Sequence, residues 1–439
     1  MNEISQIIIH FFLFLFLTSF PINILTTPKL SRIFNNSYFS LILVNSSILL
    51  LIFLILSFFR LNLNYIFFSI SSLYIFIFII NSTKIFQLNL FNNNLYLKIL
   101  FVILCFSLFF NTANNLEIGW DGLGIWLFKA NGIYNGLNYS DLYSDEFTYL
   151  QYPHLGSYIW AFFWKNSFLQ LEYLGRFFYL FIYLVSIFIL AENLKKVSTF
   201  KRILFVIVIL LFSYDYNNTM GGYQELIIFA LLIFSAKLLE LIQTSKKEFN
   251  FVTLSIFLLI NLLILSWIKN EAFFYSLFLM FIYLLNYKSN SKTIIFFIIG
   301  LILITFQIIL KKYFFDLEKA FLFSLSTESL IKNINISELI DRIFYTTVYI
   351  FHSILKYPIS IINLISLIIF LKYFKKMEEY KYYLYFFVFN LIFLYSVYIV
   401  TDAPLIWHLK TSIERLILQT SGLYIFILVH LINKKIIKF

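Results

Sequence analysis

The chain has 439 residues, of which 61% are hydrophobic and only 13% are charged. Soluble domains carry about 25% charged residues, so this composition excludes an ordinary soluble enzyme. The formal net charge is +11, and its distribution, described below, argues against a nucleic-acid partner. A single cysteine, Cys105, excludes an internal disulfide and a cysteine-based metal site.

Apolar runs long enough to cross a bilayer recur along the whole chain. They predict an all-α, polytopic integral membrane protein that forms a single domain over residues 1–439. The first run follows no basic segment and precedes no small-residue cleavage site, so we interpret it as a retained span. About thirteen spans are predicted, at 6–25, 38–59, 64–81, 97–112, 172–192, 201–215, 222–241, 251–268, 272–286, 293–310, 357–373, 382–400 and 416–433.

Two long loops interrupt the spans, at 113–171 and 311–356. Within them the segments 153–169 and 343–356 are apolar but broken by polar residues, and we predict helices at the membrane interface there. The segment 311–345 mixes charged and apolar residues, which predicts short surface helices.

The basic residues are distributed unevenly between the two sides that these spans create. About 20 basic and 5 acidic residues fall on one side, against about 13 basic and 17 acidic on the other. Basic loops mark the cytoplasm, so we predict a bacterial inner (cell) membrane protein with its N-terminus outside and its C-terminus inside. Topology and anionic membrane lipid then explain the positive charge without nucleic acid.

Five polar segments with an unusual residue mix all fall on the predicted outer face. They are "GWDGLGIW", "YPHLGSYIW", "YDYNNTMGGYQE", "WIKNEAF" and "WHLKTSIERL". Segments far apart in sequence thus converge on one membrane face, which indicates a functional site there.

The first of these segments predicts a short helix that begins near Gly122. Asp121 would then be its N-cap, and Lys129 would share a face with Asp121 at i, i+8 spacing. Trp120 and Trp126 are the residue type that anchors a helix at headgroup level. The alternative to a functional role is that Asp121 only caps this helix.

The order of these motifs over residues 117 to 420 resembles the GT-C superfamily of membrane glycosyltransferases, such as the protein mannosyltransferases and lipid A aminoarabinose transferases. The motifs are "WDGLGIWLFKA", "YPHLGSYIWAFFW", "GGYQELIIFALL", "WIKNEAFFYSL" and "WHLKTSIERLILQ". The resemblance implies transfer of a hexosyl or pentosyl group from a polyprenyl-phosphate carrier to a glycan, lipid or protein acceptor at the outer face. Four spans precede the acidic loop where many members have one, and the role of these first spans is open.

The resemblance and the chemistry of sugar transfer together assign roles to three residues. Asp121 is the predicted catalytic base, since a base must take the proton of the attacking hydroxyl. Lys269 and Arg415 are predicted to bind the carrier phosphate, because the leaving group develops negative charge. The alternatives are a snorkelling Lys269 paired with Glu271, and an Arg415 paired with Glu414 or a lipid headgroup.

Further substrate-binding candidates lie in the same segments: Glu271, His408, His154, Glu225 and Lys129. Structural roles are the alternatives for them. The remaining acids of the first long loop, which are Glu117, Asp141, Asp145 and Glu146, are interpreted as solvated. No cofactor is predicted; the family context allows a divalent metal, but no second acid stands beside Asp121 to support one.

Other functional classes are less consistent with the sequence. There is no Walker A loop, GxGxxG, HExxH or paired-histidine motif, which argues against ATP-driven transport and metalloprotease chemistry. A transporter or flippase of a lipid-linked or anionic substrate is the main alternative, although its polar residues should lie near mid-membrane. An O-antigen ligase or polymerase is chemically close to the first hypothesis.

Overall fold

The computed structural model describes residues 3–18, 32–34, 37–59, 61–85, 94–115, 117–137, 141–143, 150–165, 172–213, 221–245, 247–287, 290–314, 336–401 and 403–437. All regular elements in these ranges are helical, so the prediction of an all-α fold is confirmed for this part of the chain. The elements are α1 (Glu3–Thr18), α4 (Tyr38–Leu56), α5 (Leu63–Ile85), α6 (Leu95–Asn114), η1 (Gly122–Leu127), α7 (Phe128–Tyr134), η2 (Asp141–Tyr143), α8 (Leu155–Lys165), α9 (Tyr173–Asn193), α10 (Thr199–Ser213), α12 (Glu225–Thr244), α13 (Glu248–Ser266), α14 (Asn270–Tyr287), α15 (Ser291–Ile309), η3 (Leu310–Phe314), α17 (Ile336–Lys356), α18 (Pro358–Lys372), η4 (Phe374–Tyr380), α19 (Tyr382–Val400) and α20 (Leu405–Asn433).

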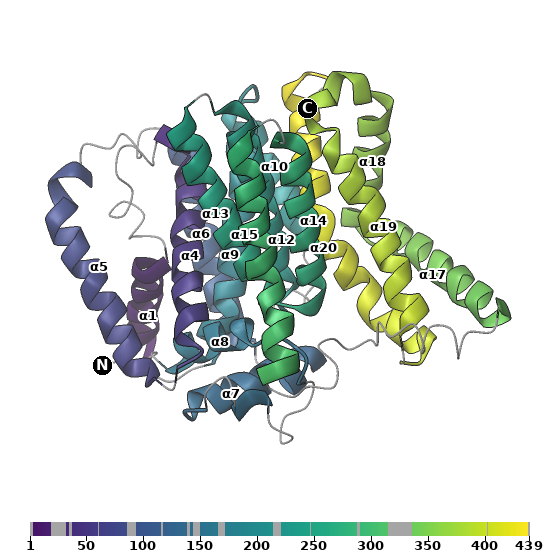
Figure 1. Ribbon diagram of the computed structural model, residues 1–439. Coiled ribbons are helices and arrows are strands. Elements are labelled where there is room, and N and C mark those ends of the chain that lie inside the picture. Colours follow the sequence, from purple (N-terminus) through teal and green to yellow (C-terminus); the bar gives the residue numbers. More distant parts are fainter. Residues whose placement is uncertain are drawn as a thin grey trace.

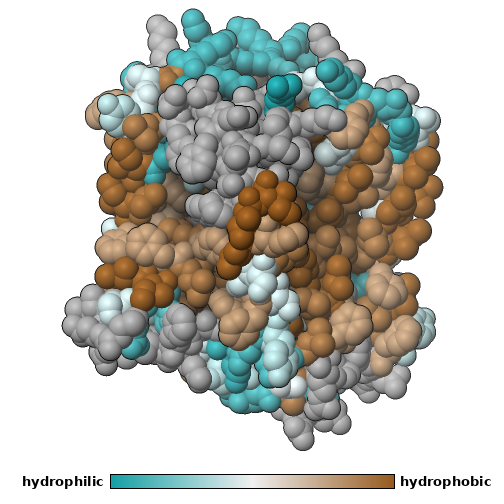
Figure 2. Space-filling view, turned by 90° about the vertical axis from the view of Figure 1, so that its left-hand side faces the viewer, coloured by the Kyte–Doolittle hydropathy of each residue, from teal (hydrophilic) through white to brown (hydrophobic). Residues whose placement is uncertain are grey.

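The helices are consistent with a membrane protein. Seven of those in the described ranges are long and apolar enough to cross a bilayer, and α17 with α18 makes an eighth if that bent pair counts as one span. Each of the thirteen predicted spans overlaps one helix, but α10 and α18 have only 15 residues each, so thirteen crossings are not established. Figure 2 shows an apolar band between more polar ends.

The centre of the bundle is α9, which is buried along its whole length. Its sequence is apolar on all sides, as expected for a helix surrounded by protein. Helices α4, α6, α8 and α12 pack around it, and α12 packs in turn against α13 and α20 (Figure 1). The helices that carry the polar motifs are therefore held by the most buried part of the molecule.

One end of the bundle is closed by η1, α7 and α8; we call it the α7 end (Figure 1). Helix α8 is buried from Leu155 to Phe163, so the predicted interfacial helix packs inside the protein. Ser157 Oγ donates to Trp126 O at 2.9 Å, and Tyr179 Oη donates to Gly156 O at 2.8 Å. These bonds join α8 to η1 on one side and to α9 on the other.

Helix α17 is one 21-residue helix that meets α18 at a bend of 102°. Short surface helices were expected over 311–345; instead η3 continues α15 to Phe314 and α17 begins at Ile336, while 315–335 lies outside the described residues. Arg342 Nη1 donates to the carbonyls of Tyr398, Ile399 and Thr401 at 3.1–3.2 Å. This one nitrogen thus lies within hydrogen-bond distance of three carbonyls left open at the end of α19.

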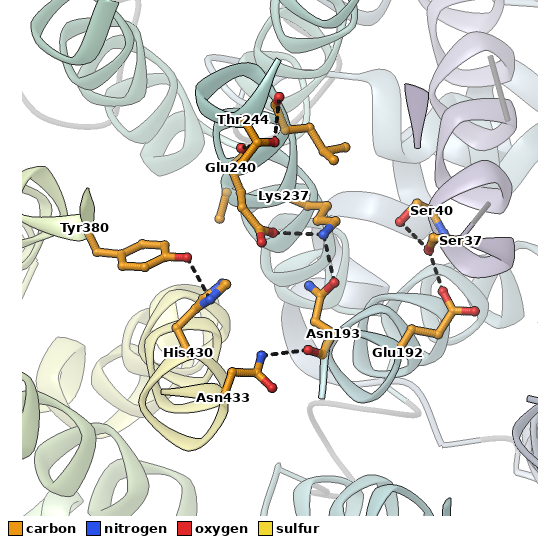
Figure 3. A network of polar contacts seen from close by, with 12 residues as sticks. Ser37, Ser40, Glu192, Asn193, Lys237, Glu240, Thr244, Tyr380, His430 and Asn433 are labelled. Atoms are coloured by element: carbon orange, nitrogen blue, oxygen red, sulfur yellow. Dashed lines mark hydrogen bonds and ion pairs between the residues drawn. The ribbon is translucent and has the colours of Figure 1, made fainter. Parts of the chain in front are cut away.

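A polar network ties the helices together at the opposite end, where the C-terminus lies (Figures 1 and 3). Lys237 Nζ donates to Asn193 Oδ1 and Glu240 Oε2, both at 2.8 Å. Asn433 Nδ2 donates to Asn193 O at 2.7 Å, and Tyr380 Oη bonds His430 Nδ1 at 2.7 Å. The network joins α9, α12, α20 and η4, so the charges of α12 face protein.

Candidate functional site

The segment that carries Asp121 is placed by close backbone contact with the start of α12. Gly119 N donates to Gly221 O at 2.9 Å. A Cβ on Gly122 would lie 2.1 Å from Gly221 O, so only glycine fits at position 122. Gly222 has φ +79°, a conformation that favours glycine. The glycines of both motifs therefore let two loops cross at the α7 end.

The prediction that Asp121 caps a helix is wrong. Asp121 itself has helical dihedral angles and its side chain makes no capping bond; a π-helix, η1, follows it. A π-turn changes which side chains share a face, so Asp121 and Lys129 point to different partners. The carboxylate of Asp121 instead pairs with Arg415.

Five charged side chains form one network, which we call the Asp121 cluster: Asp121, Glu225, Lys269, Glu271 and Arg415. Arg415 Nη1 pairs with Asp121 Oδ2 and lies 3.6 Å from Glu225 Oε1. The same Glu225 oxygen accepts from Lys269 Nζ at 2.9 Å, and Lys269 lies 3.5 Å from Glu271 Oε1. The two predicted phosphate-binding cations thus meet on one carboxylate beside Asp121.

Four chain segments bring these groups together. Asp121 precedes η1, Glu225 is the first residue of α12, Lys269 lies in the break between α13 and α14, and Arg415 lies on α20. Glu225 also sits at a helix N-terminus, where the helix dipole favours a negative charge. All four segments therefore present charge at the α7 end of the bundle.

Burial differs across the Asp121 cluster. The Glu225 and Lys269 side chains are 0% and 5% exposed, whereas Asp121 and Arg415 are 14% and 12% exposed. Burial alone would lower the pKa of Lys269, but Glu225 and Glu271 outweigh it and raise that pKa. Buried charges are tolerated when they are paired, so Glu225 and Lys269 form the fixed part and Asp121 lies at the accessible edge.

Tyr223 adjoins the Asp121 cluster and was not among the residues predicted from the sequence. The Arg415 guanidinium lies 4.9 Å from the centroid of its ring, a cation–π contact. The place of Tyr223 between the glycine pair and Glu225 in "GGYQE" was the available signal.

Two other candidates, His154 and Lys129, lie close to each other and have hydrogen-bond partners outside the Asp121 cluster. His154 Nε2 bonds Ser57 Oγ at 2.7 Å, and its ring packs edge-on against Trp267. Burial, Lys129 and Lys311 lower the pKa of His154 well below that of an ordinary histidine. Lys129 is buried and donates to Tyr152 O at 2.8 Å, and burial lowers its pKa to about 7.

His408 is on α20 and lies near the Asp121 cluster: burial, Arg415 and Lys269 lower its pKa to about 4, while Asp121 acts in the opposite direction. Its Nδ1 bonds Thr401 Oγ1 at 2.8 Å, and its ring lies 5.1 Å from that of Tyr398. It therefore positions the turn before α20. Trp126, predicted to anchor at headgroup level, is fully buried, whereas Trp120 is 59% exposed.

Lys311 is a buried residue that the sequence interpretation missed. Its Nζ donates to Gln151 O at 2.6 Å and Asn270 Oδ1 at 3.2 Å. Two lysines at the end of a long apolar run were the available signal. Among the loop acids, Glu117 N donates to Asn115 Oδ1 at 2.9 Å, while Asp145 and Glu146 lie outside the described residues.

A groove of about 210 Å³ lies between α17, α18, α19 and α20. Ile417, two residues after Arg415, forms part of its wall, with Thr420 and Tyr424 further along α20. These three residues share a face of α20 that points away from Arg415, because residues two apart on a helix lie on opposite sides. Within the described ranges, no three His, Cys, Asp or Glu side chains are grouped so that they could hold a metal ion.

Comparison with protein-family models, curated proteins and solved structures finds no match to this chain.

Proposed function

We propose that this protein is a membrane glycosyltransferase that moves a sugar from a polyprenyl-phosphate carrier to a hydroxyl acceptor at the outer face of the membrane. One observation carries the proposal: Arg415 lies between Asp121 and Glu225, and Lys269 shares Glu225. A potential base and two potential phosphate ligands thus occupy one partly exposed cluster. The GT-C resemblance of the motifs that supply these residues points to the same reaction.

The phosphate must displace a carboxylate to bind, because both cations are already paired. Asp121 is the partner that can leave, since it is 14% exposed while Glu225 is fully buried. When a phosphate oxygen takes its place on Arg415, Asp121 is released beside the substrate. Binding of the donor and release of the base are then one event.

The released Asp121 carboxylate accepts the proton of the acceptor hydroxyl as its oxygen attacks the anomeric carbon. The bond between that carbon and the phosphate oxygen breaks, and the phosphate leaves with the electron pair. Arg415 and Lys269 stabilise the charge that develops on it. Glu225 fixes both cations so that little reorganisation is needed during the reaction.

The lipid part of such a donor needs an apolar surface beside the Asp121 cluster. The groove between α17, α18, α19 and α20 is apolar, but Ile417, Thr420 and Tyr424 in its wall lie on the face of α20 opposite Arg415. It therefore does not lead directly to the Asp121 cluster. Under this proposal the chain crosses the membrane thirteen times, with the Asp121 cluster, the α7 end and the N-terminus outside and the C-terminus in the cytoplasm.

The proposal is tested in cells that lack this protein by mass spectrometry of envelope glycolipids and glycans. One glycan should lose a sugar, and wild-type protein should restore it. Asp121→Asn should not restore it, because loss of a catalytic base costs about 10²–10⁴ in rate. Asp141→Asn, a loop acid outside the Asp121 cluster, is the matched control and should restore it. An unchanged envelope, or full rescue by Asp121→Asn, contradicts the proposal.

A transporter or flippase remains the second candidate because one observation favours it. The groove between α18, α19 and α20 contains Asn363, Asn390 and Thr420, and Asn390 is the ninth of the 19 residues of α19. Polar residues near mid-membrane are typical of transporters. Reconstituted protein that moves a fluorescent polyprenyl-phosphate lipid between leaflets, without sugar transfer, would support this function.

A further inference from the structure

The end of the bundle opposite the Asp121 cluster has a polar pocket of about 430 Å³, which we call the lysine pocket. It is lined by Tyr373, Lys376, Lys434, Lys435 and Ile436. Lys434 directly follows α20 and lies about 28 Å along the helix axis from the cluster. This is close to the thickness of the hydrocarbon layer, about 30 Å. The lysine pocket and the Asp121 cluster therefore lie at opposite headgroup levels if α20 spans a bilayer (Figure 1).

Two chain segments form the walls of the lysine pocket. One is η4 with Tyr373, the residue between α18 and η4, and the other is the end of α20. Lys434 Nζ donates to Lys376 O at 2.9 Å, and the same ammonium group pairs with Glu379 of η4. These contacts fix the two walls relative to each other.

Accessible positive charge in the lysine pocket favours an anion. Lys376 and Lys435 are exposed, and neither forms an ion pair with another described residue. The adjacent acid, Glu379, is already paired with Lys434, and no acidic side chain is among the described residues that line the pocket. Lys376 Nζ lies 5.5 Å from the centroid of the Tyr373 ring, so this cation stays at the pocket. Lysine binds phosphate as a point charge.

The backbone at Lys435 is a second, independent observation. Helix α20 ends in a Schellman motif: Ile436 N donates to Leu431 O at 3.0 Å, and Lys435 N donates to Ile432 O at 2.9 Å. Lys435 has φ +57°, where glycine is the usual residue and any other side chain costs stability. A lysine in this conformation indicates that its side chain is used for something other than folding.

Apolar side chains beside the lysine pocket favour a lipid over a soluble anion. Ile436 lines the pocket itself. Near the end of α18, shortly before Tyr373, Ile368 and Leu371 are 54% and 48% exposed. Exposed apolar side chains followed by lysines are typical of a helix that leaves the acyl region at the headgroups. An anion with acyl chains therefore matches both parts of this surface.

We propose that the lysine pocket binds the phosphate of an anionic phospholipid from the leaflet opposite the Asp121 cluster, with Lys376 and Lys435 as its ligands. Such a lipid would join η4 to the end of α20. The inference does not depend on the proposed function, because it uses only the chemistry of these two helix ends.

Site-specific photo-crosslinking tests the proposal on the purified full-length protein in nanodiscs of equal parts phosphatidylglycerol and phosphatidylcholine. With p-benzoylphenylalanine in place of Ile436, mass spectrometry should show crosslinks mainly to phosphatidylglycerol. The matched position is Phe200, which is 73% exposed at the same end and precedes Lys201 and Arg202. Its crosslinks should follow the lipid composition more closely. An equal preference at both positions would reflect only a basic surface and would overturn the pocket.

Glycerol phosphate in solution distinguishes a lipid from a free phosphate. It has the same phosphate group without acyl chains, so it should not displace phosphatidylglycerol from the crosslinker at position 436. Displacement at millimolar concentration would overturn the assignment to lipid.

Two substitutions, made with the crosslinker at position 436, test the named ligands. Lys376→Gln should lower the phosphatidylglycerol yield about fivefold, the effect expected for one lost charge contact. Lys435→Gly should lower it by a similar factor without lowering the unfolding temperature, because glycine suits the left-handed backbone. The control Lys196→Gln removes an exposed charge outside the pocket and should leave the yield unchanged. Wild-type yield in either pocket variant would refute the site.

Discussion

At the scale of single residues, the central feature is that Glu225 Oε1 serves both Lys269 and Arg415. Truncating one member of a buried ion pair leaves an uncompensated charge and costs about 3–5 kcal/mol. Glu225 is therefore both structural support and the element that sets the spacing of the two cations. Asp121 is different, because it lies at the edge of the Asp121 cluster and can exchange with a ligand.

This exchange predicts opposite effects of two substitutions on binding of polyprenyl phosphate. Asp121→Asn should bind it a few-fold to about tenfold more tightly than wild type, because a neutral amide competes weakly for Arg415. Arg415→Lys should bind it more weakly, because a point charge replaces the planar fork. Affinities from native mass spectrometry would measure both. Weaker binding to Asp121→Asn would show that Asp121 does not compete for Arg415.

Lys129 predicts a pH dependence of stability. Its pKa is about 7 in the folded protein against 10.5 for an ordinary lysine, because of burial. Between these values the unfolded chain binds the extra proton, so this residue makes stability rise with pH from about 7 to about 10.5 and lowers it as pH falls. Unfolding temperatures of wild type and Lys129→Met measured across that range should differ in slope, with the flatter curve for the variant. Parallel curves would mean that Lys129 keeps its ordinary pKa.

At the scale of elements, the site depends on how closely η1 approaches the start of α12. Gly122 and Gly124 differ in how much space lies beside them, and only the packing of the folded chain shows this difference. A Cβ on Gly122 would meet a backbone carbonyl, whereas Gly124 has open space on its Cβ side. A backbone atom cannot rotate away as a flexible side chain can, so the contact at Gly122 has no inexpensive relief.

Gly122→Ala and Gly124→Ala therefore form a matched pair within one helical segment. Gly122→Ala should lower the free energy of unfolding by about 1–3 kcal/mol, as overpacking does, and it should displace Asp121 from Arg415. Gly124→Ala should be neutral or stabilising by up to about 1 kcal/mol. Thermal unfolding of the two variants in detergent compares them directly. Equal losses in both would argue against the observed crossing of the loops.

At the scale of the whole molecule, the two proposed sites lie at opposite ends of the bundle, and the two labelled termini also lie at opposite ends (Figure 1). Helices α9 and α12 connect the two ends through an interior that is mainly apolar, with a few buried polar side chains such as Ser186 and Ser235. Such an arrangement fits a protein that works on one face of a bilayer and contacts lipid on the other.

The proposed orientation predicts which engineered cysteines a membrane-impermeant reagent reaches in intact cells. In a Cys105→Ser background, Asp145→Cys should be labelled from outside and Lys196→Cys only after the membrane is opened. The reason is that the basic loops, which include Lys196, mark the cytoplasmic side. The reverse pattern would invert the orientation and place the Asp121 cluster in the cytoplasm.

The sequence by itself determined the all-α class and the apolar character of the helices, because the length and composition of apolar runs are local properties. It also pointed to Asp121, Glu225, Lys269, Glu271 and Arg415. The predicted topology places the polar helix ends that carry these residues on the same side of the membrane. The lateral arrangement of helices depends on side-chain packing across the bundle, and a single chain carries no readable signal for that. Only the tertiary structure could therefore assign Asp121 to Arg415 instead of a helix cap, bury α8 and Trp126, and give His154 and His408 the hydroxyls of Ser57 and Thr401 as hydrogen-bond partners.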